Sequence, residues 1–333
     1  MGVSRKFTTV HRTQRSIEDF RGDYSPLAKM VQCSWGENSQ QSLCYSAEFF
    51  QSYLTSPGAT SSLAPTLYDG DALIAFASGF PRFVECRGNS LHLISCSFLS
   101  VLPEYKKFGF GIALWSELVK RIRAANFDGM VNFCVDGEPM NGMIEGCCRM
   151  LKLPVHRIFS VRYMSSLLKA GDFTASTTGP PASCVKDFLE LAAPLISCQP
   201  LARKWTLEEA EWQCFDRTGA LVAHASHGPR RGILTGYIMP IDNRERTKCL
   251  LVEDIFWDEL ELEERISLLH QFLSTAVSHG AQMATVPILG YTDLSAFKKA
   301  RFFPTRRVLH CYLTLFNGNL LPETLPSMYL DVF

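Results

Sequence analysis

The same order of expected elements occurs twice along the chain, and this repeat constrains the fold more than any other feature. Each half ends in strand, helix, strand, helix and strand, as apolar residues recur at strand or helix spacing. In the first half, we expect these elements at residues 91–101, 112–122, 130–135, 141–151 and 155–164. In the second half, we expect them at residues 249–256, 261–278, 284–289, 293–300 and 308–316. The offset is about 150 residues throughout, so the pattern repeats although few residues are identical.

The elements upstream of this repeat indicate antiparallel strands. In the first half, helices are expected at residues 26–33 and 47–54, and strands at 64–68 and 73–83. Hairpin-type turns at Asp69-Gly70 and Arg87-Gly88-Asn89 join the strands, so we expect them to pair antiparallel. A Gly-, Pro-, Ser- and Thr-rich stretch at residues 171–184 predicts a linker between two domains, 1–170 and 185–333. The fold class is therefore α/β (α+β), with two similar units that each carry a mixed, mostly antiparallel sheet flanked by helices.

Composition excludes several classes of protein. Lys and Arg total 33, as do Asp and Glu, so the chain lacks the basic excess of a general nucleic-acid binder. No apolar run reaches the ~18–20 residues that span a bilayer, and the first residues have no apolar signal segment. The twelve Cys form no CxxC pair, so we predict buried free thiols, no metal and a cytoplasmic location.

The stretch that points to chemistry runs from Val101 to Gly111, directly after one expected strand and before the next expected helix. Gly109 and Gly111 leave room for a close ligand, because glycine has no side chain. The helix that follows presents unpaired N–H groups and a partial positive charge, and Lys106 and Lys107 add full charges. A pyrophosphate is the natural ligand of such an anion-binding loop.

This stretch resembles the acyl-CoA-binding signature of the GNAT acetyltransferase superfamily, V-x-P-x-Y-(Q/R)-x-x-G-x-G/A. The matching residues are Val101, Pro103, Tyr105, Gly109 and Gly111. Lys106 departs from the usual Gln or Arg, and Asn141 stands where the family has an Asn near the pantetheine of the cofactor. The resemblance implies an acyl-CoA site formed by Leu99, Val101, Lys106, Lys107, Phe108, Gly109, Phe110, Gly111, Ile112 and Asn141. It also implies that the backbone amides of Leu99 and Val101 contact the thioester and the pantetheine.

The second half resembles the same fold without the signature. After the strand at residues 249–256 comes Trp257-Asp-Glu-Leu-Glu-Leu-Glu-Glu264, which is rich in carboxylates and contains no glycine. Negative charge there would repel a pyrophosphate. The resemblance therefore implies two tandem GNAT-like domains, an acyl-CoA-binding catalytic one at 1–170 and a degenerate one at 185–333.

The catalytic residues are less well defined by the resemblance. Many family members place a Tyr seven residues after the Asn to protonate the leaving thiolate, and Cys148 occupies that position here. Cys148 is a candidate acid or covalent acyl relay, with a packing role as the alternative. For the general base we consider Glu145 and His92, and also Asp136 and Glu138 after the fifth strand. A packing role is the alternative for His92.

Two adjacent carboxylates, Glu253 and Asp254, lie on the second-half strand that corresponds to the cofactor strand. Neighbouring residues of a regular strand point to opposite faces, so we expect at most one of them to face the cleft of the sheet. Asp254 is a candidate for recognition of an amine substrate, and a surface or capping role is the alternative.

The leading functional hypothesis is an acyl-CoA-dependent N-acyltransferase, most simply one that transfers acetyl from acetyl-CoA to an amine of a small molecule. Alternatives keep the fold but use an acyl carrier protein as donor, or an O or S acceptor. A further alternative is a non-catalytic acyl-CoA-binding module. Partners in a membrane are not expected, and nucleic acid is disfavoured by the neutral charge.

Overall fold

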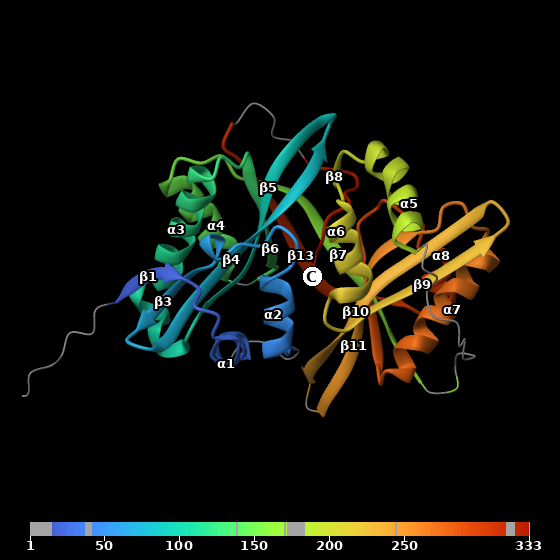
Figure 1. Cartoon of the computed structure of the whole chain (residues 1–333), viewed down its shortest axis with the longest axis horizontal. Helices are drawn as coiled ribbons and strands as arrows, with labels where there is room; N and C mark the ends of the chain where they lie inside the picture. Colours follow the sequence, from blue (N-terminus) through green and yellow to red (C-terminus); the bar gives the residue numbers. More distant parts are fainter. Residues whose placement is uncertain are drawn as a thin grey trace, which may run out of the picture.

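A single mixed sheet runs through the whole molecule in the computed structural model, which describes residues 15–36, 42–137, 139–169, 171, 184–243, 245–317 and 324–332. Its main path follows the order β1-β3-β4-β5-β6-β13-β7-β12-β11-β10-β2, with β8 added beside β4 and β9 beside β10. Helices α3 and α4 cover the first half of the sheet, and α7 and α8 cover the second (Figure 1).

The bounds of the described elements are as follows. The strands are β1 Ser16–Asp19, β2 Ser42–Leu43, β3 Pro65–Asp69, β4 Ala72–Cys86, β5 Asn89–Val101, β6 Gly129–Val135, β7 His156–Leu167, β8 Leu201–Arg203, β9 Ala220–His227, β10 Arg230–Asn243, β11 Glu245–Phe256, β12 Met283–Ile288 and β13 Phe303–Leu315. The α-helices are α1 Tyr24–Gly36, α2 Ala47–Leu54, α3 Phe110–Ala124, α4 Pro139–Met150, α5 Cys184–Cys198, α6 Leu207–Glu211, α7 Leu262–Ser278 and α8 Ser295–Lys299. Short 3-10 turns lie at Ser61–Leu63 (η1) and Pro103–Phe108 (η2), and a π-helix (η3) lies at Trp212–Asp216.

The strand pairing confirms the expected fold class. The sheet is mostly antiparallel, and β3, β4 and β5 pair antiparallel through the turns that the sequence indicates. Two parallel pairs interrupt this pattern, β5 with β6 and β11 with β12. They occupy corresponding places in the two halves, as the repeated element order predicts.

The two halves exchange strands, which the sequence did not indicate. β13, from the end of the chain, lies between β6 and β7 of the first half. β7 in turn lies between β13 and β12. Smaller exchanges join β2 to β10 and β8 to β4. The expected linker at residues 171–184 lies outside the described residues except for Gly171 and for Cys184, which begins α5.

The described end of the chain lies in the middle of the molecule, where the two halves meet (Figure 1). The tail at residues 324–332 is held by backbone hydrogen bonds from Met328 to Leu289 and from Tyr329 to Leu201. Arg203 returns a backbone bond to Tyr329. Residues from three distant parts of the chain therefore meet at this seam.

The cysteines are all free thiols, and nine of the twelve are buried. This agrees with the expected packing role of most of them. Within the described ranges, none of the helices combines the length and apolar character needed to cross a bilayer.

Candidate active site

A bulge interrupts β5 at Phe98 and Leu99. The register of β5 against β4 shifts between Phe76 and Ser78, so these two residues stand opposite Ala77 alone. Phe98 has a φ of 57°, in the left-handed region that side chains rarely adopt. A bulge takes backbone groups out of the regular ladder, so the amides at Phe98 and Leu99 are candidate donors to a thioester oxygen.

The expected backbone contact at Val101 is already engaged within the protein. Its N–H donates to Ser34 Oγ of α1 at 3.2 Å. Leu99 lies in the bulge, and its contact with the donor stays a prediction.

The loop after β5 has the shape expected of an anion site. It forms η2 and then turns at Gly109, whose φ of 76° favours glycine, and α3 begins at Phe110. Among the residues that the structure describes, no side chain caps the start of α3. A Cβ added at Gly109 would meet no atom within 4 Å, and one at Gly111 would reach only Val101 Cγ2 at 3.5 Å. The helix end is therefore open to an anion.

The side chains of this loop differ in whether they contact the rest of the protein or are exposed. Lys106 turns back onto the protein, and its Nζ donates to the Ser34 carbonyl at 3.0 Å. Lys107 lies over the ring of Phe108 at 5.6 Å. Phe108 and Ile112 are 55% and 42% exposed, which is unusual for apolar side chains and leaves them available to a ligand. The side chain of Asn141 lies outside the described residues.

The structure does not bring the three candidate catalytic residues together. Cys148 is fully buried, its Sγ lies 3.7 Å from Thr314 Oγ1, and burial raises its pKa to about 11. This environment favours packing over thiolate chemistry. Glu145 is exposed on α4. His92 lies seven residues before Leu99 on β5, which is about 23 Å at the usual rise per residue.

His92 also has a packing environment. Its ring stacks on Phe83 with centroids 4.2 Å apart and contacts Phe127 at 4.3 Å. Burial lowers the pKa of its imidazole. Asp136 is instead in hydrogen-bond contact with His310, with 3.0 Å between Oδ1 and Nε2. Glu138 lies outside the described residues.

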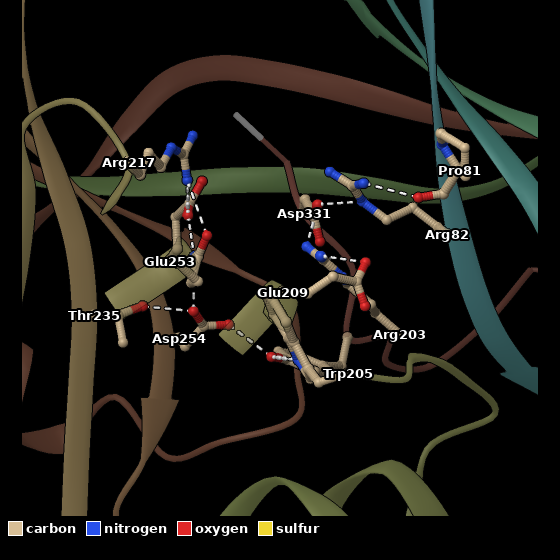
Figure 2. A network of polar contacts seen from close by, with 12 residues as sticks. Pro81, Arg82, Arg203, Trp205, Glu209, Arg217, Thr235, Glu253, Asp254 and Asp331 are labelled. Carbon is tan, nitrogen blue, oxygen red and sulfur yellow. Dashed lines mark hydrogen bonds and ion pairs between the residues drawn. The ribbon is translucent and has the colours of Figure 1, made fainter. Parts of the chain in front are cut away.

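A buried polar network lies at the seam between the halves (Figure 2). Arg217 pairs with Glu253, and its guanidinium lies 3.6 Å from the ring centroid of Tyr237. Gln213 Nε2, on the π-helix, donates to Glu253 at 2.5 Å and to Asp254 at 2.9 Å. Burial raises the pKa of both carboxyl groups, although Arg217 opposes this at Glu253.

Asp254 is held by neutral donors. Its Oδ2 accepts from Thr235 Oγ1 at 2.5 Å, and its Oδ1 accepts from Tyr329 of the tail at 2.6 Å. Asp254 is 3% exposed, so the surface alternative is wrong.

The alternation expected at Glu253 and Asp254 is also wrong, because β11 carries a bulge there. Its register against β10 shifts between Leu234 and Gly236, so both carboxylates stand opposite Thr235 alone. This bulge corresponds to the one at Phe98 and Leu99 in the first half. The first half has the apolar residues Phe98 and Leu99 in its bulge, whereas the second half has the acids Glu253 and Asp254.

The second part of the network fixes the tail. Asp331 accepts from Arg82 Nε at 2.7 Å and from Arg203 Nη1 at 2.5 Å. Arg203 also pairs with Glu209 at 3.1 Å. Burial alone would raise the pKa of Asp331, but the two guanidinium groups hold it well below its ordinary value.

Two small hollows meet at the tail. One, with room for about one water molecule, is lined by Gln213, Glu253, Asp254, Pro287, Leu330, Asp331 and Val332. The other, of similar size, is lined by Arg82, Val84, Leu93, Ser95, Val131, Phe133, Leu330 and Asp331. Across the described parts of the chain, no group of three His, Cys, Asp or Glu side chains is placed to hold a metal.

Solved structures of an acyltransferase share this architecture. Saccharomyces cerevisiae N-myristoyltransferase with bound myristoyl-CoA matches with a TM-score of 0.74 and 15% identity, over 94% of this chain and 85% of that one. The chain has the fold of N-myristoyltransferase. A second structure of that enzyme with myristoyl-CoA matches with the same TM-score at 14% identity, over 94% and 80% of the two chains. A third, with myristoyl-CoA and inhibitors, matches with a TM-score of 0.72 at 14% identity, over 94% and 82%.

The sequence itself matches no protein-family model and no curated protein. The likeness therefore concerns the fold, which the N-myristoyltransferase structures share along nearly the whole chain. It agrees with the acyltransferase fold implied by residues 101–111. The seam network is the part of the candidate site that the sequence did not reveal, although the adjacent acids at Glu253 and Asp254 were its one visible signal.

Proposed function

We propose that the protein is an N-acyltransferase that moves a long fatty acyl chain from acyl-CoA to an amine of a peptide. The observation that carries this proposal is the match to N-myristoyltransferase with bound myristoyl-CoA, which extends over 94% of the chain. It is supported by the uncapped start of α3 and by the bulge at Phe98 and Leu99.

The residues suit this reaction in distinct ways. The pyrophosphate of the donor suits the open N-terminus of α3, and Lys107 and the exposed Phe108 and Ile112 lie beside it. The thioester oxygen suits the amides at Phe98 and Leu99, because bulged amides are fixed donors for developing negative charge. The neutral amine nitrogen then attacks the thioester carbonyl carbon, the C–S bond breaks, and CoA leaves as the thiolate. The thiolate takes up the proton that the nitrogen loses, so the products are the N-acyl amide and the CoA thiol. Positioning provides most of the rate in such a transfer.

This proposal replaces two finer expectations from the sequence. The myristoyl-CoA of the structural neighbours favours a long acyl chain over acetyl, and their N-acyl transfer agrees with an amine acceptor. The sequence led us to expect a small-molecule amine as the acceptor. We now propose a peptide amine, because the match to N-myristoyltransferase extends over both halves of the chain. A cytoplasmic site of action remains our expectation, since free thiols suit a reducing compartment.

The test is a donor and acceptor matrix with the purified protein. Donors are acetyl-, octanoyl-, myristoyl- and palmitoyl-CoA and one acylated carrier protein. Acceptors are a set of short peptides with free α-amines, the same peptides acetylated at the N-terminus, and small amines. We expect release of CoA thiol and a mass gain of one acyl group with the long-chain donors and free-amine peptides. Turnover only with acetyl-CoA and small amines would contradict the proposal.

A non-catalytic acyl-CoA-binding protein would give a different result in the same experiment. It would shift its melting temperature with acyl-CoA, since a ligand of the native state stabilises it. It would release no thiol with any acceptor.

A further inference from the structure

The two equivalent bulges face the seam with opposite chemistry, and the acidic one has no assigned role. In the first half, the bulge at Phe98 and Leu99 is apolar and suits a thioester. In the second half, the corresponding bulge presents Glu253 and Asp254 to the small hollow that Gln213, Pro287 and Leu330 also line. Both carboxylates are more than nine-tenths buried, at 9% and 3% exposure. Buried charge is costly unless it is compensated, so this arrangement calls for a partner.

The charges around this bulge do not balance among the described residues. Of the two carboxylates, Glu253 is paired with the guanidinium of Arg217. Asp254 instead accepts hydrogen bonds from the neutral donors Gln213, Thr235 and Tyr329. The neighbouring group of Arg82, Arg203, Glu209 and Asp331 pairs two guanidiniums with two carboxylates. Any negative charge that the described ion pairs leave uncompensated therefore lies at Glu253 and Asp254, and not at the tail.

One oxygen of this pair makes no hydrogen bond. In the part of the chain that the structure describes, Glu253 Oε1 is buried and has no partner. Arg217 also has two unbonded nitrogens, Nε and Nη2, but its guanidinium lies over the rings of Tyr237 and Trp212. These cation–π contacts stabilise the positive charge of Arg217, but the rings donate no hydrogen bond to a carboxylate oxygen. Glu253, which lines the hollow, thus has one unused acceptor, Oε1.

The shape of the site suits a small organic cation. Over the described ranges, the carboxylates are not arranged as a metal site. A primary ammonium has three donors and a compact charge, and it fits a hollow lined by carboxylate oxygens and the apolar Pro287 and Leu330. The same hollow borders Asp331 and the tail, so its occupant lies at the seam where both halves contribute.

We propose that the hollow beside Glu253 and Asp254 binds a protonated amino group of the acceptor. This deepens the proposed function, on which it rests, by defining the acceptor as a cation that the second half recognises. The group is either the amine that becomes acylated or a second amine of the same peptide. Both have the same chemistry, and the test distinguishes them.

The test measures binding separately from turnover. The protein is loaded with a non-reactive thioether analogue of myristoyl-CoA, and peptide binding is measured by isothermal titration calorimetry. The peptides are one with a single amino group at its N-terminus, its deaminated counterpart, and a deaminated peptide that carries one lysine. The variants are Glu253→Gln and Asp254→Asn, with Glu85→Gln as control, because Glu85 pairs with Lys204 outside the hollow.

The expected result is that wild type prefers an ammonium-bearing peptide over the fully deaminated one by about tenfold or more, as for a buried charged hydrogen bond. The preference should fall to less than about threefold in Glu253→Gln and in Asp254→Asn and persist in Glu85→Gln. Preference for the N-terminal amine identifies the reacting amine as the occupant, and preference for the lysine peptide identifies a second amine. Asp254→Asn leaves the Arg217–Glu253 pair in place, so it keeps the test informative if Glu253→Gln does not fold.

Two outcomes would overturn the inference. One is equal binding of charged and deaminated peptides, or no binding of any of them, by wild type. The other is an ammonium preference that survives both substitutions in folded protein. Thiol release from acyl-CoA by a protein without the preference would retain the proposed function and reject only this inference. Carboxylate-dependent binding without any turnover would reject the proposed function instead.

Discussion

The junction after β5 and the junction after β11 occupy equivalent places in the two halves and have opposite properties. After β5, the chain turns at Gly109 into an α3 that has no side-chain cap. After β11, α7 is closed by a capping box in which Glu261 and Glu264 satisfy its first N–H groups. Arg230 and Arg265 hold this second junction together, through Glu264 and the Leu260 carbonyl.

The comparison indicates how one fold can form an anion site in one half and an acidic site in the other. Unpaired N–H groups at a helix start attract anions, and carboxylates that already accept those N–H groups exclude them. The first junction is therefore suited to the donor pyrophosphate. The second has lost that capacity, while the nearby bulge has gained the carboxylates Glu253 and Asp254.

The largest expected effect comes from separating the two halves. Fragment 1–170 lacks β13, which pairs with both β6 and β7, so its sheet would be open at the centre. We expect it to be insoluble or unfolded alone, and to form a folded complex when co-expressed with fragment 171–333. Circular dichroism and thermal melting measure this. A cooperative melt of fragment 1–170 by itself would show that the halves are independent.

The next effect concerns the tail that ties the halves together. Asp331→Asn leaves the buried guanidinium of Arg82 without a carboxylate and that of Arg203 with Glu209 alone, and we expect a loss of about 3 kcal/mol of unfolding free energy at pH 7. Because the pKa of Asp331 is lowered in the folded protein, its stabilisation is present above the ordinary value near 4. That stabilisation is lost as the pH falls further.

The difference between wild type and Asp331→Asn should therefore shrink below about pH 4. Urea unfolding at pH 3, 5 and 7 measures it. A difference that is constant over this range would contradict the assigned ion pairs.

A smaller effect tests the first junction itself. Gly111→Glu places an acid in the first turn of α3, where it is tolerated by the helix but repels a phosphate. We expect acyl-CoA affinity to fall by about 100-fold, with a melting temperature equal to wild type or higher. Gly111→Ala is the matched control, because it adds the same Cβ without charge. Equal affinities of the two variants, measured by calorimetry, would place the donor elsewhere.

The smallest effect tests the second junction. Glu264→Gln weakens the capping box and the pair with Arg230, and we expect a small decrease in melting temperature. Acyl-CoA affinity should not change. A change in affinity larger than about threefold would mean that this junction takes part in donor binding.

The sequence predicted the elements well because they depend on local patterns. Apolar spacing predicted α2 and α7 within a residue of their observed bounds. The turns at Asp69-Gly70 and Arg87-Gly88-Asn89 predicted the antiparallel pairing of β3, β4 and β5. These features depend on neighbours within a few residues.

What the sequence could not predict depends on contacts between distant residues. The exchange of β13 into the first half leaves no local mark, because its residues would alternate in the same way beside any strand. The bulge at Glu253 and Asp254 reverses the expected alternation, and only the register of β10 reveals it. The burial of Cys148 and the stacking of His92 likewise follow from tertiary packing.

The most direct test of the account is hydrogen–deuterium exchange of the whole protein with and without myristoyl-CoA. We expect myristoyl-CoA to increase amide protection at residues 98–112, which include the β5 bulge and the start of α3. Residues 253–264 at the corresponding second junction should show no change. Protection at the second junction, or none at the first, would contradict the central claim that the first half alone binds the donor.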